Sequence, residues 1–176
     1  MQVGVVLHPA IVTRGAEVVG ALGQGDRVID ISLTRVDQQA QMDPVLQRSL
    51  VGVVGQDFPP QGLEDLKARG VDLAGLEVNE EGKTFRWKGK YHDNMNGRDT
   101  LDTQLGVFET FAPKLPEHYK ECDYLFLANI VPALQLQVLE QMTTRPKLVG
   151  LDSMNLWIDI ARDDLVKIIS KVDVLT

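Results

Sequence analysis

Three short, mainly apolar runs constrain the fold of this 176-residue chain more than any other feature. They are Leu50–Val54, Tyr124–Leu127 and Lys147–Asp152. All three runs predict strands, and the first, which is apolar throughout, predicts a strand covered on both faces. Each run is followed by apolar residues at helical spacing, and strands that alternate with helices predict right-handed crossovers and a mainly parallel sheet. The sequence therefore predicts the α/β class, with helices on both faces of the sheet.

The segments after these runs carry helix signals. After the first run, Leu63 and Leu66 mark a short helix that Gly70 ends. After the second, Pro132 suits a first helical turn, and the apolar positions that follow at helical spacing are Leu134, Val138 and Met142. After the third, one helix is predicted by the positions Ile158, Ala161, Leu165 and Ile168.

The ends of the chain add weaker elements. Val3–Leu7 and Arg27–Leu33 are typical of strands, and Ile11–Leu22 predicts a helix interrupted by glycine. Val172–Leu175 begins one more strand, where the chain stops. Ending inside such a strand is unusual for a complete domain of this class, so we expect one partial domain over residues 1–176, incomplete at its carboxyl end.

A more exposed stretch lies in the middle of the chain. Asn79–Gly82 is a turn signal, and Thr84–Tyr91 alternates aromatic and basic residues as an exposed strand does. We expect a loop over His92–Leu105 and a strand over Gly106–Phe111. This stretch therefore predicts an amphipathic hairpin outside the main sheet.

Charge and composition narrow the classes of function. The formal net charge is −7 and the basic residues are scattered, so no basic stripe suits nucleic acid. The single cysteine, Cys122, has no internal disulfide partner, which fits a reducing compartment. The first residues lack a basic signal-peptide region and are too short an apolar run to span a membrane. We expect a cytoplasmic protein without nucleic-acid or membrane partners.

Several segments of the chain show a shared order of motifs. Val51–Pro59 has the pattern Val-Gly-x-x-Gly-x-Asp over a strand and loop, and it is followed by the segments Gly70–Leu76, Thr84–Trp87, Leu127–Pro132 and Gly150–Trp157. In this order, these segments resemble the PfkB (ribokinase-like) carbohydrate kinases. The resemblance covers about residues 50–176 and leaves residues 1–50 divergent. It implies a ribokinase-like three-layer fold with a small β lid over approximately residues 76–111.

The resemblance also implies an activity, the ATP-dependent phosphorylation of a sugar or nucleoside hydroxyl, with ATP and Mg²⁺ as cofactors. Lid strands in this family often make dimer contacts, which implies a homodimer through the lid. The family's catalytic base lies in a late Gly-Ala-Gly-Asp motif, which is absent after residue 50. Gly23–Asp26 has a related form but leads into a strand, so we expect a surface turn there. We assign no catalytic residue and expect the fragment to be inactive alone.

Candidate binding residues follow strand ends or lie on the lid. Asp57 can bind a substrate hydroxyl or cap the helix near Pro59. Arg86 and Trp87 can grip an acceptor from the lid, or Trp87 can pack against the sheet or another subunit.

Two further strand ends carry amides and a carboxylate. Asn129 can face the acceptor or satisfy its own loop backbone. The resemblance places Asp152 and Asn155 near the phosphates and Mg²⁺, and the alternative is a turn with an N-cap for the helix starting near Leu156.

No metal site is predicted, because the three histidines and Cys122 show no ligand spacing. Besides the kinase hypothesis, a non-catalytic ligand-binding or dimerising domain remains open. A dinucleotide-binding enzyme is disfavoured, since no Gly-x-Gly-x-x-Gly follows a strand.

Overall fold

The computed structural model describes residues 2–6, 27–31, 47–93 and 97–176. For residues 2–6, 27–31 and 98 only the backbone is described. The predicted helix over Ile11–Leu22 and the predicted turn at Gly23–Asp26 lie outside the described residues.

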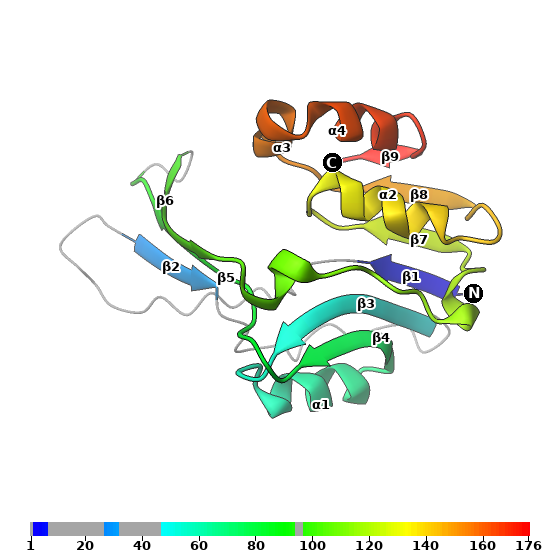
Figure 1. The fold of residues 1–176 in the computed structure, drawn as a ribbon, viewed down its shortest axis with the longest axis horizontal. Coiled ribbons are helices and arrows are strands. Elements are labelled where there is room, and N and C mark those ends of the chain that lie inside the picture. The colour runs from blue at the N-terminus through cyan, green and yellow to red at the C-terminus, as the bar shows by residue number, and fades with distance from the viewer. Residues whose placement is uncertain (1, 7–26, 32–46, 94–96) are drawn as a thin grey trace.

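The main sheet has six parallel strands in the order β4-β3-β1-β7-β8-β9 (Figure 1). The strand from the chain's beginning, β1 (Gln2–Val6), lies at the centre of the sheet. The other strands are β3 (Gln47–Gly55), β4 (Val71–Asn79), β7 (Tyr124–Leu127), β8 (Leu148–Leu151) and β9 (Val174–Leu175). The predicted parallel sheet is therefore confirmed.

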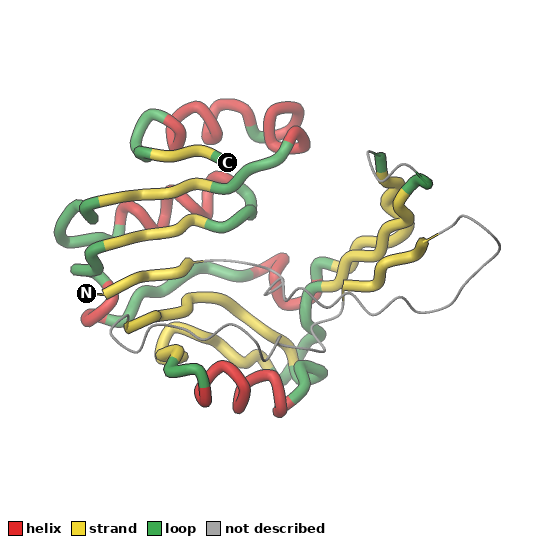
Figure 2. The backbone as a smooth tube through the Cα atoms, turned by 180° about the vertical axis from the view of Figure 1, so that it is seen from behind, coloured by secondary structure: helices red, strands yellow, loops and turns green. Residues whose placement is uncertain are grey.

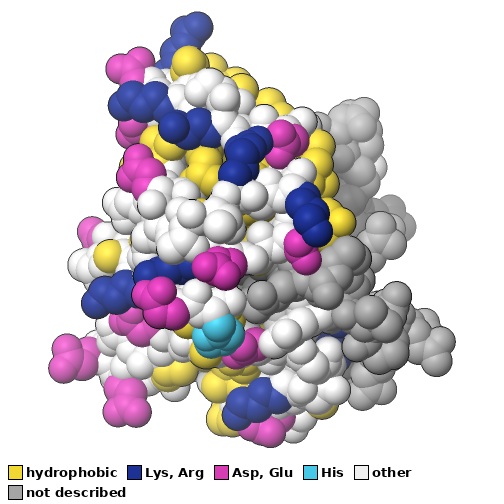
Figure 3. Space-filling model, turned by 90° about the vertical axis from the view of Figure 1, so that its right-hand side faces the viewer, with side chains coloured by type: hydrophobic (Ala, Val, Ile, Leu, Met, Phe, Trp, Pro, Cys, Tyr) yellow, Lys and Arg dark blue, Asp and Glu magenta, His cyan; other side chains and the backbone are white. Residues whose placement is uncertain are grey.

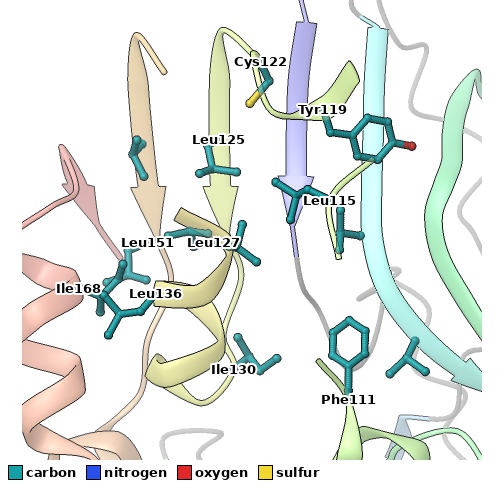
Figure 4. Packing of buried hydrophobic residues seen from close by; sticks show 14 of the residues in the cluster. Phe111, Leu115, Tyr119, Cys122, Leu125, Leu127, Ile130, Leu136, Leu151 and Ile168 are labelled. Carbon is teal, nitrogen blue, oxygen red and sulfur yellow. The ribbon is translucent and has the colours of Figure 1, made fainter. Parts of the chain in front are cut away.

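Helices cover both faces of this sheet. On one face, α2 (Pro132–Glu140) and α4 (Arg162–Ile169) pack over β7 and β8 (Figure 4). The core there joins strand and helix residues, among them Leu127, Val149, Leu151, Leu136, Val138, Leu165 and Ile168. Val51 and Val53 of β3 belong to this cluster, whereas Leu50 and Val54, which alternate with them, are buried outside it. Leu66 of α1 (Pro60–Ala68) is also buried outside the cluster. The predicted α/β class is confirmed.

A second, three-stranded antiparallel sheet forms a lid. Its strands are β2 (Arg27–Ile31), β5 (Arg86–Tyr91) and β6 (Arg98–Gln104), in the order β2-β5-β6. Figures 1 and 2 show it extending from the edge of the main sheet at which the parallel strands end. Residues 76–79 belong to β4 instead, and β2 joins the lid from a distant part of the sequence.

Two predictions next to the hairpin were wrong. The predicted loop over His92–Leu105 contains β6, whose side chains are polar at most positions and so give no alternating signal; pairing with β5 makes it a strand. The predicted strand over Gly106–Phe111 is a 3₁₀ helix, η1 (Gly106–Thr110). Its first residue, Gly106, has a φ of 56°, which a strand does not accommodate.

The predicted single helix after β8 was also wrong. It is divided into α3 (Asn155–Ile160) and α4 at Ala161, whose φ and ψ of −142° and 35° are not helical. The residues of α3 are largely exposed, so packing does not hold it in line with α4. The break lets α3 lie beside the end of β7, as described below.

Charges of both signs cover the amino-terminal ends of the strands. Figure 3 shows Lys and Arg interspersed with Asp and Glu on that face. Ion pairs there include Arg145–Asp173 at 2.7 Å and Lys147–Asp123 at 2.7 Å. Within the described part of the chain, no helix has the length and apolar character needed to cross a membrane.

Candidate functional site

The carboxyl ends of neighbouring strands bring the polar candidates to one edge of the main sheet. Asn129 follows β7, Asp152 follows β8, and Thr176 follows β9. These three strands are adjacent, and neighbouring strands lie about 4.8 Å apart. The lid extends from the same edge of the main sheet (Figure 1). Open α/β sheets bind ligands at this edge, so it is the candidate site.

Asn129 is held by an aromatic side chain. The indole Nε1 of Trp157, on α3, donates a 2.8 Å hydrogen bond to Asn129 Oδ1. The oxygen of Asn129 is therefore engaged by a residue of α3, a partner outside its own loop. With its oxygen engaged, the amide can offer its two N–H donors to a ligand hydroxyl.

Asp152 is fixed mainly through its backbone. Its N–H donates to Leu127 O at 2.9 Å, and its carbonyl accepts from Gln135 Nε2 at 3.1 Å. The Thr176 hydroxyl lies 3.5 Å from Asp152 Oδ1, the outer limit for a hydrogen bond. The half-buried carboxylate therefore keeps acceptor positions for a ligand.

Asn155 is the exposed first residue of α3. The N-cap of this helix is Met154, which makes no side-chain capping bond. The predicted N-cap role for this segment was therefore wrong. Asn155 and Asp152 nevertheless lie on the same short connection from β8 to α3.

Asp57 lies at what we call the lid root, where the loop after β3 contacts the segment that leads into β5. Its Oδ1 accepts a 2.7 Å hydrogen bond from Thr84 N, and the Thr84 hydroxyl in turn accepts one from Gly55 N at 2.9 Å. Burial raises the pKa of the Asp57 carboxyl, but the Thr84 N–H and hydroxyl, with Lys83 nearby, outweigh it and hold the pKa below its usual range. The N-cap of α1 is Pro59 with no side-chain bond, so the predicted capping role of Asp57 was wrong.

The two lid candidates differ in their surroundings. Arg86 is exposed at the start of β5. Trp87 is half-buried, and its Nε1 donates a 3.3 Å hydrogen bond to Thr100 Oγ1 on β6. A side chain at Gly89 would collide with the indole of Trp87, which therefore occupies the space beside that glycine. Trp87 thus packs within the lid itself.

The structure brings Asn129, Asp152 and Asn155 together, whereas Asp57 lies after β3, on the other side of the central strand β1. Sequence reasoning assigned no role to Gln135 or Trp157. The sequence feature that could have identified Gln135 is its position three residues before the buried Val138, on the apolar face of α2. Trp157 entered the sequence analysis only as the last residue of Gly150–Trp157, a segment that resembles the kinase family.

The described residues form no protein cage for a metal ion. Among them, no group of three or more His, Cys, Asp or Glu side chains is placed to hold a metal ion. Mg²⁺ at phosphate sites usually keeps several waters and is held by one or two carboxylates together with substrate phosphates, and Asp152 can supply such a carboxylate at this edge. No reaction step is therefore derived through the metal.

A parallel sheet with helices on both faces, and an antiparallel lid at its carboxyl edge, defines the class as an α/β protein of ribokinase-like fold. No protein-family model and no curated protein matches the sequence. Solved structures do match, with sequence identities of 20%, 17% and 16%, so they show the fold alone.

One match is a nucleoside kinase of Methanocaldococcus jannaschii, an archaeal member of the ribokinase family, with a TM-score of 0.56 and 20% identity over 73% of this chain. A putative ribokinase II from E. coli matches in its apo form, with a TM-score of 0.53 and 17% identity, and in complex with ATP and Mg²⁺, with a TM-score of 0.57 and 16% identity. The matches cover 42% to 45% of those chains, so this chain spans less than half of their length. The predicted ribokinase-like fold is confirmed.

Proposed function

We propose that this chain forms the acceptor-binding side of an ATP-dependent kinase that phosphorylates a sugar or nucleoside hydroxyl. One observation carries the proposal: Asn129 and Asp152 follow the ends of two adjacent strands, each held by its own hydrogen bond, at the edge from which the lid extends. The fold is shared with a nucleoside kinase and a putative ribokinase, which supports this class of acceptor.

The proposed acceptor is a small polyhydroxylated molecule. The amide of Asn129 donates to a hydroxyl oxygen, and the carboxylate of Asp152 accepts from a hydroxyl proton. Arg86 donates from the lid, and Asp57 accepts at the lid root through the lone pairs that Thr84 leaves open. Asp152 and Asn155 lie nearest to the phosphates in this arrangement. The acceptor is thereby held between a rigid strand edge and the lid.

Phosphate transfer is assigned to the kinase as a class and not to these 176 residues alone. The printed sequence contains no Gly-Ala-Gly-Asp segment to supply a base and an anion hole. ATP and Mg²⁺ are the cofactors that the proposed reaction would require. We expect the chain by itself to bind the acceptor without transferring phosphate.

The alternative function is a non-catalytic ligand-binding or dimerising domain. Leu101 and Leu105, on and after β6, are 51% and 45% exposed, and apolar side chains of this size favour a covered surface. A homodimer through the lid would cover them. Sedimentation of the wild-type chain and of Leu101→Asp tests this, since only a lid dimer loses mass in the variant.

Isothermal titration tests the main proposal. The purified chain is titrated with D-ribose, D-fructose and adenosine, and separately with ATP and Mg²⁺. We expect one of the three acceptors to bind, and Asp152→Asn to weaken it by about tenfold or more, the usual effect of losing a hydrogen bond to a charged group. Asp164→Asn, on the outer surface of α4 where Asp164 pairs with Lys167, is the matched control and should bind normally.

Two outcomes would overturn the proposal. If none of the three acceptors binds the folded chain, the acceptor assignment fails. If an acceptor binds equally well to Asp152→Asn and to the wild-type chain, the candidate site is not where it binds.

A further inference from the structure

Gln135 is a polar side chain that is buried among apolar core residues. It lies on α2, is 1% exposed, and is one of two buried polar residues in the described part of the chain. Its Nε2 lies 2.9 Å from Ala128 O, 3.1 Å from Asp152 O and 3.4 Å from Leu127 O. A single amide nitrogen therefore contacts the carboxyl ends of both β7 and β8.

We infer that Gln135 is a positioning residue, which fixes the spacing between Asn129 and Asp152 by joining the two strand ends that carry them. This inference rests on the proposed function of that edge. Ala128 directly precedes the candidate binding residue Asn129, and Asp152 is itself the second candidate binding residue.

The backbone explains why such a residue is needed. The ladder between β7 and β8 pairs residues 124–127 with 148–151 and ends there. Beyond the ladder, β7 leads into α2 and β8 leads into the connection to α3, so the two segments separate. Buried carbonyls that have left a ladder need other donors. Gln135 donates to Ala128 O and Asp152 O across this gap.

The other end of the amide shows that the donor, and not the acceptor, is the part of Gln135 that this core uses. Gln135 Oε1 is buried and has no hydrogen-bond partner among the described residues. An unsatisfied buried acceptor is costly, so an apolar side chain of the same length would remove that cost but would leave both carbonyls without their donor. The donor function is thus the property that Gln135 adds to this core.

The first test needs no ligand, because Trp157 reports on the site through its bond to Asn129. The chain has two tryptophans, so Trp87→Phe leaves Trp157 as the sole emitter. In that background we compare Gln135→Met with Val138→Ala, which truncates a fully buried residue on the same helix. We expect Gln135→Met to shift Trp157 emission to the red and to speed amide exchange at Asp152. Val138→Ala should lower the unfolding midpoint without either change.

The second test measures ligand affinity in the chain with both tryptophans. Gln135→Glu places a carboxylate, which cannot donate, beside three carbonyls, whereas the protonated acid can donate to one of them. With D-ribose and adenosine as probes, the affinity of Gln135→Glu relative to the wild-type chain should be lost at pH 7.5 and partly regained at pH 5. Val138→Ala should keep its relative affinity at both pH values.

The results separate the two claims. If neither probe binds the wild-type chain, the proposed function fails, while the fluorescence and exchange data still decide the role of Gln135. If Gln135→Met and Val138→Ala change Trp157 emission and Asp152 exchange alike, Gln135 is an ordinary core residue and the inference is overturned. A relative affinity of Gln135→Glu that does not change with pH would also contradict it.

Discussion

The parallel sheet and the lid are stabilised by different kinds of contact. In the sheet, Leu127 and Leu151 are completely buried between the strands and the helices. In the lid, most side chains of β5 and β6 are half-buried or exposed, and the indole of Trp87 lies next to Gly89. Apolar burial therefore fixes the strand edge, whereas strand pairing holds the lid. We therefore expect the lid to be the more adjustable wall of the proposed site.

The two regions are joined at a narrow junction. Gln56 N donates to Gly82 O at 3.0 Å, and Val107 N donates to Lys83 O at 2.8 Å. With the bond between Asp57 and Thr84, these contacts tie the end of β3 to both connections of the lid. The lid can thus change its angle only by disturbing this junction.

The largest expected difference between the regions concerns core packing. Leu151→Ala should lower the free energy of unfolding by about 2–5 kcal/mol, because the removed side chain leaves a cavity in a closed core. Leu101→Ala in the lid should change it by less than about 0.5 kcal/mol, because Leu101 is already half exposed. Urea unfolding measures both. Equal losses would mean that the lid shares the core of the sheet, or that a partner covers it.

Two glycines with positive φ distinguish the junction from the main body. Gly106 has a φ of 56°, and a Cβ there would collide with the carbonyl oxygen of Lys83. Gly70, which ends α1, has a φ of 71° but open space around it. Gly70→Ala should cost about 1 kcal/mol for the left-handed conformation alone, and Gly106→Ala more than about 2 kcal/mol.

Limited proteolysis sharpens that comparison. Gly106→Ala should make the lid strands cleavable at protease concentrations that leave the wild-type chain intact, since the added methyl group forces the junction apart. Gly70→Ala serves as the control for backbone strain. If both variants are equally resistant, the junction does not hold the lid in place.

The sequence predicted the sheet better than the lid, and the reason is physical. Strands such as β7 and β8 are buried on at least one face, so their apolar runs are visible in the sequence. The strand β6 depends on pairing with β5, and β2 joins the lid from far along the chain. Such long-range pairing leaves no local pattern.

The candidate site shows the same division. The ends of β7 and β8, and with them Asn129 and Asp152, follow from the apolar runs before them. The bond from Trp157 to Asn129 joins residues twenty-eight positions apart, and no local pattern signals such a contact. The capping role of Asp57 failed because the N-cap of α1 is Pro59, and Asp57 instead accepts from Thr84, twenty-seven residues away.

A smaller effect is expected from one hydrogen bond at the junction. Thr84→Val removes the acceptor of the 2.9 Å bond from Gly55 N and should cost about 1 kcal/mol. Thr103→Val, on an exposed position of β6, is the matched control and should be close to neutral. The measurement is urea unfolding followed by the emission of Trp87 in a Trp157→Phe background. A loss in the control as large as in Thr84→Val would show that the lid strands, and not the junction, limit stability.

The smallest expected effect is a pH dependence that compares carboxylates in the two regions. Burial raises the pKa of Asp72, but the N–H of Ala74, His118 and Tyr119 outweigh it and lower the pKa, as Thr84 does for Asp57 at the lid root. A lowered pKa in the folded state means that the stabilisation is complete above the unfolded pKa, about pH 4, and is lost as the pH falls through the folded value. Asp72→Asn and Asp57→Asn should therefore each flatten the fall in stability between about pH 4 and pH 2.

The two variants should differ in the probe that detects the change. Asp72 accepts from Ala74 N at 2.9 Å and lies 2.9 Å from His118 Nε2, at the amino-terminal edge of the main sheet. Its loss should appear in the unfolding of the sheet, followed by Trp157, whereas the loss of Asp57 should appear first in Trp87. If both variants alter both probes by the same amount, the lid and the sheet unfold as one unit, and the adjustable wall inferred from their contacts does not exist.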